Sequence, residues 1–338
     1  MGPAPGATSA DAPLVTIDDV RRAATTLQGV ATRTPLVPFG PPSAGHFLKA
    51  ESLQPIGAFK IRGAYVAVAS LASDVRARGV ITYSSGNHAQ GVARAARLLG
   101  APAVVVMPSD APALKRARVE ADGAEVVIVG PSSDERQQVA ERLADERGLA
   151  IIPPFDDDRI IAGQGTVGLE IVEDLPDVAA VLVPIGGGGL ASGVAVAVKA
   201  LAPRARVIGV EPELAADARD SLREGRIVRW PSEDVSRTIA DGTRTTALGV
   251  RTFAHLARLL DAVVTVTEAE IAAGVRLAAE QSRLVAEPSG AVAVAALAFG
   301  RQEAGIDLAA GPVVAVVSGG NVDPDRYRSY LEAPIPAT

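Results

Sequence analysis

The chain of 338 residues contains no cysteine, which excludes disulfides, thiolate metal sites and cysteine nucleophiles. Aromatic residues make up only 3% of it and hydrophobic residues 48%, so the core must consist mainly of Ala, Val, Leu and Ile. No segment approaches the ~18 uninterrupted apolar residues of a membrane-spanning helix. The beginning, MGPAPGATSADAP, lacks the basic stretch and apolar block of a signal peptide. We therefore expect a cytoplasmic protein with a disordered tail over residues 1–13.

A concentrated basic run is also missing, and 33 basic against 39 acidic residues give a net charge of −6. Nucleic acids and anionic membrane surfaces attract proteins that carry basic patches. The charge balance therefore argues against both as the main partner.

Short β-branched segments alternate with helical patterns along most of the chain. The predicted strands are 79–83, 103–107, 124–129, 179–184, 206–211, 262–267 and 312–317. They are almost continuously apolar, and apolar residues recur at helical spacing between them. Strands of this kind are covered by helices on both faces, which predicts a doubly wound α/β fold with parallel sheets. Three closely spaced βα units predict a small domain at 79–152, inserted between residues 14–78 and 153–338 of a large domain.

Four consecutive glycines follow a buried strand and precede a helix in VLVPIGGGGLASGVAVAVKAL. Glycines allow backbone amides to turn toward an anion, and the N-terminus of the helix adds positive potential. One interpretation is a dinucleotide site, as in a nicotinamide-dependent dehydrogenase. Gly186, Gly188 and Ala191 match G-x-G-x-x-A, and Glu211 ends the next strand, where a ribose-binding acid would lie. Another interpretation is a cup around one phosphate, such as that of pyridoxal phosphate (PLP). A purely structural turn would explain the glycines without a ligand.

Lys60, in GAFKIRGAY, lies where the amphipathic pattern calls for an apolar residue. Most lysines in helices are simply solvated, so this one residue decides nothing alone. PLP, however, needs a lysine for its aldehyde. A free lysine with a pKa of about 10.4 is a poor nucleophile at neutral pH, whereas a lysine held as an imine exchanges readily with a substrate amine. Lys60 therefore favours the PLP interpretation.

Three further stretches lie at predicted strand ends or helix starts. YSSGNHAQG places Ser84, Ser85 and Asn87 at the carboxyl end of a strand, where ligands bind in open α/β sheets, although turn and capping chemistry also explains them. Ser318, in VVAVVSGGNVD, could face a ring nitrogen without forcing it to stay protonated. Glu287 precedes Pro-Ser-Gly in LVAEPSG, which is equally typical of a helix start.

Taken together, GAFKIRGAY, SSGNHAQG, IAGQGTVGLEI, PIGGGGLASG and SGGNVD resemble the fold-type II PLP enzymes, specifically the threonine/serine dehydratases and serine racemases. The motifs occur in the family's order, and the resemblance covers about residues 15–325. It implies two doubly wound parallel-sheet domains, large and small, with the cofactor between them. It also implies a homodimer.

The resemblance assigns a role to each motif residue. Lys60 would bind the cofactor aldehyde as an imine and, once displaced by the substrate amine, would take the α-proton. The β-hydroxyl would then leave as water, and the product would hydrolyse to a 2-oxo acid and ammonia. The other cofactor-binding residues would be Phe59 beside the lysine, Asn87 at the phenolic oxygen, Gly186, Gly187, Gly188 and Gly189 at the phosphate, Ser318 at the ring nitrogen, and Glu287. The loop of Ser84, Ser85, Gly86, Asn87 and His88 would bind the substrate carboxylate.

Two features of the racemase-like branch are also implied. Ser85 lies where serine racemases carry a second acid/base opposite the lysine, so racemisation stays open. EPELAAD matches a metal loop in which Glu211, the carbonyl of Ala215 and Asp217 would bind Mg²⁺, Mn²⁺ or Ca²⁺, which prefer such oxygen ligands. An acidic helix start explains the same residues.

The substrate is less sharply indicated than the cofactor. Arg136 aligns with a position that can face a second carboxylate, which would favour 3-hydroxyaspartate over threonine, although a solvated helix arginine is an equal interpretation. Ile56 and Ala58 replace the Thr and Ser that the family usually has before its lysine.

We therefore predict a PLP-dependent serine/threonine dehydratase, an ammonia-lyase (EC 4.3.1.-) that acts on a small β-hydroxy amino acid. The alternatives within the family are a 3-hydroxyaspartate dehydratase and a serine racemase. Those outside it are the NAD-dependent dehydrogenase and a PLP-binding protein without catalysis.

Overall fold

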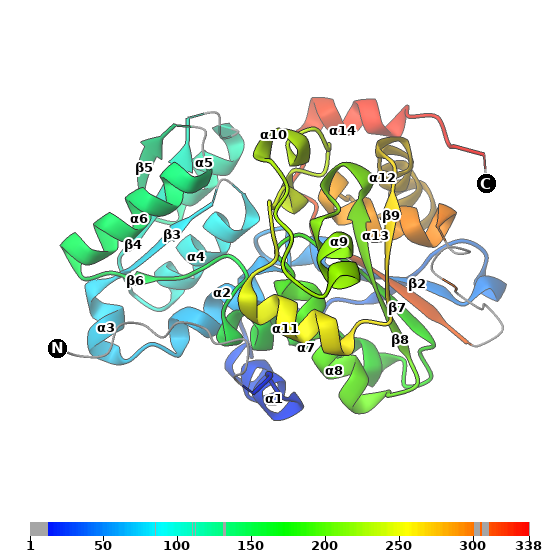
Figure 1. Cartoon of the computed structure of the whole chain (residues 1–338), viewed down its shortest axis with the longest axis horizontal. Helices are drawn as coiled ribbons and strands as arrows, with labels where there is room; N and C mark the ends of the chain where they lie inside the picture. Colours follow the sequence, from blue (N-terminus) through cyan, green and yellow to red (C-terminus); the bar gives the residue numbers. More distant parts are fainter. Residues whose placement is uncertain are drawn as a thin grey trace.

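The computed structural model describes residues 13–84, 86–109, 111, 113–130, 133–300, 305 and 311–337. Within these ranges the strands form a six-stranded sheet, ordered β1-β2-β10-β7-β8-β9, and a four-stranded sheet, ordered β5-β4-β3-β6. Figure 1 shows the four-stranded sheet with its helices on the left and the six-stranded sheet on the right. All neighbouring strands pair in parallel except β1 (Leu36–Pro38) and β2 (His46–Ala50). The predicted α/β class with parallel sheets is confirmed.

Helices cover both faces of the six-stranded sheet. Leu182 of β7 packs in a core with α12 and α13, whereas its neighbours Val181 and Val183 pack in a core with α7 and α8. Successive residues of a strand point to opposite faces, so an apolar strand buried on both sides is expected here. The elements concerned are β7 (Ala180–Pro184), β8 (Arg206–Pro212), β9 (Ala262–Val266), β10 (Val313–Val317), α7 (Asp158–Asp174), α8 (Gly189–Leu201), α11 (Val250–Leu259), α12 (Glu268–Ser282) and α13 (Pro288–Phe299).

The four-stranded sheet is built in the same way. Val80 and Val105 pack in a core with residues of α2 and α4, and Ile81 and Val104 pack against α6 on the other face. Its elements are β3 (Val80–Tyr83), β4 (Ala103–Pro108), β5 (Glu125–Val129), β6 (Ala150–Ile151), α2 (Lys60–Ala69), α4 (Asn87–Leu98), α5 (Ala113–Ala121) and α6 (Ser133–Arg147). Its strands all come from within residues 79–152, but the domain boundaries stay a prediction.

The sequence patterns do not predict β1, β2 or β6. In β2, His46 and Lys49 interrupt the apolar pattern, yet both are buried. Lys49 Nζ donates at 2.6 Å to the carbonyl of Thr34 and to Glu170, which makes burial of its charge possible.

The other helices are short or lie outside the layers that cover the two sheets. They are α1 (Ile17–Thr26), α3 (Ser73–Arg78), α9 (Asp217–Glu224), α10 (Ser232–Val235) and α14 (Pro324–Leu331). None of the helices in the described ranges is long and apolar enough to cross a membrane.

Candidate functional site

Lys60 is the first residue of α2, and the segment before it is held by the loop that follows β10. The amide of Phe59 donates to the carbonyl of Ser318 at 3.0 Å, and Ala58 forms a β-bridge with Gly319. Lys60 Nζ donates to the carbonyl of Pro154 at 2.8 Å and lies 5.1 Å from the centre of the Phe59 ring. Burial lowers the pKa of Lys60 to about 8. A neutral amine is therefore accessible near physiological pH, as a nucleophile or a proton acceptor requires.

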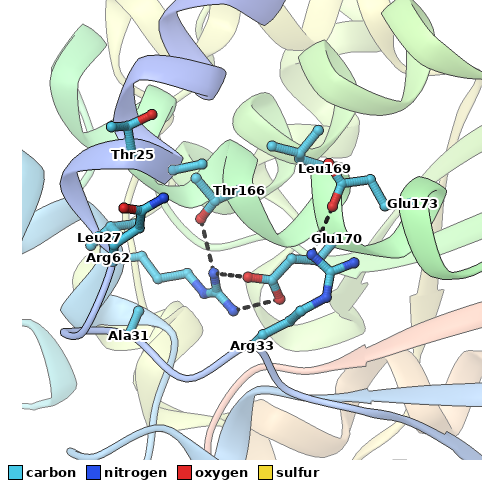
Figure 2. Close-up of a pocket in the computed structure, with 11 residues that line it drawn as sticks. Thr25, Leu27, Ala31, Arg33, Arg62, Thr166, Leu169, Glu170 and Glu173 are labelled. Carbon is cyan, nitrogen blue, oxygen red and sulfur yellow. Dashed lines mark hydrogen bonds and ion pairs between the residues drawn. The ribbon is translucent and has the colours of Figure 1, made fainter.

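Arg62 fixes the first turn of the same helix. Its guanidinium donates to Glu51 and Glu170 at 2.7–2.9 Å and to Thr166 at 3.0 Å. Figure 2 shows the bonds from Arg62 to Glu170 and Thr166, and nearby the pair of Arg33 with Glu173. These side chains border a cavity of about 370 Å³ that none of the predicted site residues lines. The ion cluster therefore anchors the helix that presents Lys60 rather than forming the candidate site.

The glycine run packs against an aromatic ring that the sequence analysis missed. A Cβ on Gly187 would lie 2.1 Å from the ring of Phe155, and one on Gly188, whose φ is +91°, would lie 2.8 Å from Thr252. Glycine is thus required by packing as well as by backbone conformation. The first amides of a helix have no partner within it, and no side chain caps α8 at Gly188. These amides suit an anion such as a phosphate.

One segment connects Lys60 to the glycine run. Pro154 accepts the Lys60 hydrogen bond, and Phe155 packs on Gly187. The next residue, Asp156, accepts hydrogen bonds from the amides of residues 250–252 at the start of α11. In the sequence, Phe155 lies in the run PPFDDD, which follows the unpredicted strand β6 and carries no motif that points to a site.

Asn87 begins α4 and belongs to an oriented chain of hydrogen bonds. Asn321 Nδ2 donates to Asn87 Oδ1 at 2.8 Å, and Asn87 Nδ2 donates to Glu287 Oε1 at 2.5 Å. A Cβ on Gly319 would meet Glu287 Oε1 at 2.3 Å and Asn87 Nδ2 at 3.1 Å, so only glycine allows the two side chains to meet there. Burial, followed by the charge of Asp241, raises the pKa of Glu287 to about 7. Asn321, in the recognisable motif SGGNVD, was not predicted as a site residue.

Ser318 and His88 are both buried. Ser318 Oγ donates to the carbonyl of Ser289 at 3.3 Å, which leaves its lone pairs free to accept a hydrogen bond. His88 Nε2 lies 3.1 Å from the carbonyl of Ile152, and burial, with the nearby Lys60, lowers the pKa of His88 to about 3. His88 is therefore neutral, so its side chain offers no positive charge to a substrate carboxylate.

The loop before α4 is described only in part. Ser84 Oγ accepts a hydrogen bond from the amide of Gly86 at 3.3 Å. Ser85 lies outside the described residues. Arg136 lies on α6. The substrate roles of these residues stay predictions.

Two of the predicted metal ligands are buried carboxyl groups. Glu211 accepts hydrogen bonds from the amides of Ala218 and Arg219 at 3.0 and 2.8 Å, whereas neither oxygen of Asp217 has a partner within the described residues. Burial raises both pKa values, that of Asp217 to about 7, and the charge of Asp217 raises that of Glu211 further. No cluster of three or more His, Cys, Asp or Glu side chains suited to a metal occurs in the described part of the chain. A cation there would need carbonyl or water ligands as well.

These contacts bring Lys60, Asn87, the glycine run and Ser318 together at the carboxyl ends of parallel strands, where α/β proteins bind ligands. A family model described as "Pyridoxal-phosphate dependent enzyme" matches residues 27–319. The chain belongs to this family. Membership favours a PLP site over the dinucleotide interpretation, as does Glu211, which binds the amides of α9.

Curated relatives and solved structures show where in the PLP-dependent family the chain lies. It is 43% identical over 233 residues to an L-threonine ammonia-lyase of Thermotoga maritima, a match that covers 68% of this chain and 57% of that protein. It is 40% identical over 323 residues to an L-threo-3-hydroxyaspartate ammonia-lyase of Pseudomonas sp, with 93% and 98% covered. The structure of maize serine racemase aligns with a TM-score of 0.88 at 36% identity, with 95% and 98% covered. The chain therefore spans little more than half the length of some relatives and nearly all of others. The predicted fold-type II architecture is confirmed.

Proposed function

We propose that the protein is a PLP-dependent ammonia-lyase that removes water from a small β-hydroxy amino acid, with serine or threonine as the first candidates. The observation that carries the proposal is Lys60, with its pKa near 8, beside Phe59 and the Ser318 loop in a chain of the PLP-dependent family. The names of the relatives support lyase chemistry.

The residues present fit the cofactor. Amides of the glycine run would hold the phosphate, Asn87 would donate to the phenolic oxygen, and Ser318 would face the ring nitrogen. Asn87 Nδ2 now donates to Glu287, so it would have to exchange this partner for the phenolic oxygen when the cofactor binds. When bound, PLP supplies an aldehyde for the substrate amine and an electron sink that makes the α-hydrogen acidic.

The chain's own groups perform the remaining steps. The loop at Ser84, Gly86 and Asn87 binds the substrate carboxylate and fixes the α-carbon relative to Lys60. Lys60 Nζ accepts the α-proton, for which a pKa near the working pH is favourable. The same Nζ then returns a proton to the departing β-hydroxyl, which leaves as water. The remaining enamine is hydrolysed to a 2-oxo acid and ammonia.

The test uses purified protein supplied with PLP. We expect a visible absorption band that shifts with serine, and borohydride reduction should leave a pyridoxyl adduct on the peptide that contains Lys60. Lys60→Ala should abolish the band, the adduct and the release of oxo acid. An adduct on another lysine, or none in cofactor-replete protein, would contradict the proposal.

A substrate panel separates the related activities. It contains D- and L-serine, L-threonine and the isomers of 3-hydroxyaspartate, each assayed for oxo acid, with chiral analysis of the recovered amino acid. The Pseudomonas relative, similar over nearly its whole length, makes 3-hydroxyaspartate the second candidate, and Arg136 would then bind the second carboxylate. Because the chain is similar to maize serine racemase, racemisation should also be tested. In that reaction Ser85 would be the second acid/base.

The proposal extends to a metal site, to the assembly of the protein and to its domains. Glu211, the Ala215 carbonyl and Asp217 would bind a divalent cation, because the buried oxygens of Asp217, which have no partner in the described part of the chain, suit one. We also propose a cytoplasmic homodimer, with the cofactor between a small domain at 79–152 and a large domain formed by the rest of the folded chain.

A further inference from the structure

Helix α5 carries two basic side chains that reach from the four-stranded-sheet unit to the six-stranded-sheet unit. Lys115 Nζ donates to Oδ2 of Asp241 at 2.6 Å, in the short helix η4 (Asp241–Thr243). Arg118 Nη1 donates to Oδ1 of Asn321, which follows β10. Residues three apart lie on the same face of a helix, so one face of α5 makes both contacts. Figure 1 shows α5 at the top of the four-stranded unit, on the side toward α10 of the other unit in this view.

The contact between Lys115 and Asp241 is an ion pair in which the lysine is buried and the aspartate is partly exposed. The side chain of Lys115 is 10% exposed, whereas that of Asp241 is 41% exposed. Burial opposes the charge of Lys115, but the carboxylates of Asp241 and Glu287 outweigh it and raise the pKa of Lys115. A buried ammonium without a partner is costly. The present packing of α5 therefore depends on the carboxylate that the other unit supplies.

Both contacts end on residues that organise the candidate site. Asp241 Oδ1 accepts a hydrogen bond from Ser289 Oγ at 3.2 Å, and the carbonyl of Ser289 accepts one from Ser318. Asn321 Nδ2 donates to Asn87 Oδ1. Lys115 Nζ also lies 3.9 Å from the place of a Cβ on Gly86, beside the predicted substrate loop.

We propose that the face of α5 formed by Lys115 and Arg118 is a clasp that holds the site closed across the two units. Lys115 and Arg118 are positioning residues that act through Asp241 and Asn321. The clasp must open for these ligands to enter, and when closed it restricts water at the reacting atoms. The identity of the ligands rests on the proposed function, but the closure itself does not.

The first test measures the rate at which PLP leaves the holoenzyme, with an excess of an apoenzyme as acceptor. We expect Lys115→Met to increase this rate about tenfold, equivalent to about 1.4 kcal/mol, and to raise KM more than it lowers kcat. Arg116→Ala is the matched control, because Arg116 is half exposed on the same helix and pairs only with Glu120 among the contacts recorded for it. Its values should equal those of the wild type. Lys115→Arg should restore slow release.

Ionic strength and a second variant separate a clasp from a general structural role. Because Asp241 is partly exposed, salt should speed PLP release from the wild type but not from Lys115→Met. Asp241→Asn should add little to Lys115→Met in the double variant. Additive effects, or release from Lys115→Met as slow as from Arg116→Ala, would overturn the proposal.

Hydrogen exchange provides a readout that needs no cofactor. In Lys115→Met, peptides covering 86–92 and 238–244 should exchange faster, whereas peptides from α7 and α8 should be unchanged. Uniformly faster exchange would indicate destabilisation and would overturn the clasp. A wild type that binds no PLP would contradict the proposed function. The exchange pattern would still show whether Lys115 holds the two units together.

Discussion

Asp217 and Glu211 are buried carboxyl groups whose charges are incompletely compensated. Burial chiefly raises their pKa values, to about 7 for Asp217, and the charge of Asp217 raises that of Glu211 further. Carboxyl groups in such a place either retain protons or bind a cation. In the unfolded chain both would titrate near pH ~4. Because the folded-state pKa values are higher, the pair stabilises the fold fully below pH ~4, and this contribution is lost as the pH rises through about 7.

Removal of divalent cations should therefore destabilise the protein most at alkaline pH. We expect Mg²⁺ or Ca²⁺ to raise the melting temperature of chelator-treated protein by several degrees at pH 8 and by much less at pH 5. Asp217→Asn should abolish the response to the cation and flatten the pH dependence. Differential scanning fluorimetry with and without each cation measures both. An unchanged response in Asp217→Asn would place the cation elsewhere.

At the scale of single residues, the sequence predicts groups whose chemistry is unusual for their position. Lys60 lies where an amphipathic pattern calls for an apolar residue, and four glycines between a buried strand and a helix are typical of an anion site. The structure adds Phe155 and Asn321. The ring of Phe155 matters because it packs on Gly187, about 30 residues away in the chain, and no local pattern contains that contact. Asn321 depends in the same way on its distance from Asn87 in space.

At the scale of elements, α2 is fixed by charge as well as by apolar packing. Arg62 is 1% exposed and pairs with Glu51 and Glu170, and Lys49 also pairs with Glu170, which gives two cations and two carboxylates. Breaking such a group by removing one partner leaves an uncompensated buried charge. The position of Lys60, two residues earlier, depends on this anchor.

Arg62→Met should destabilise the fold by about 3–5 kcal/mol. Arg33→Met is the matched control, since Arg33 borders the same cavity (Figure 2) but its side chain is 52% exposed while pairing with Glu173 and Asp174. Exposed pairs are weak, so its loss should be about 1 kcal/mol or less. Urea unfolding followed by circular dichroism measures the difference. Equal losses in the two variants would show that burial of Arg62 does not determine its contribution.

The same ion cluster explains which elements the sequence could predict. Parallel strands such as β7 and β10 are apolar throughout and are evident from pattern alone. The strand β2 is not, because Lys49 resembles a surface residue until Glu170, from a helix far along the chain, is placed beside it. A charged residue can be recognised as buried only when the residue that pairs with it is known.

At the scale of the whole molecule, the cofactor would contact both units at once. Ligands that bind only the folded state stabilise it by about 2.7 kcal/mol at a concentration 100 times Kd. We expect PLP to raise the melting temperature and pyridoxal, which lacks the phosphate, to raise it much less. Lys60→Ala should keep part of the PLP effect through the glycine run. Equal shifts with PLP and pyridoxal would contradict a phosphate cup at Gly186–Gly189.

The placement of β10 has a consequence for how the protein is made. This strand lies in the middle of the six-stranded sheet, between β2 and β7, although it is the last strand of the chain. During translation, at about 5–20 residues per second, β2 therefore waits on the order of 10–50 s for its neighbour to leave the ribosome. Until then the nascent chain exposes unpaired strand edges, and neither Ser318 nor Asn321 is available. The candidate site can therefore be completed only after β10 and the SGGNVD segment have left the ribosome, and until then the unpaired strand edges are open to aggregation.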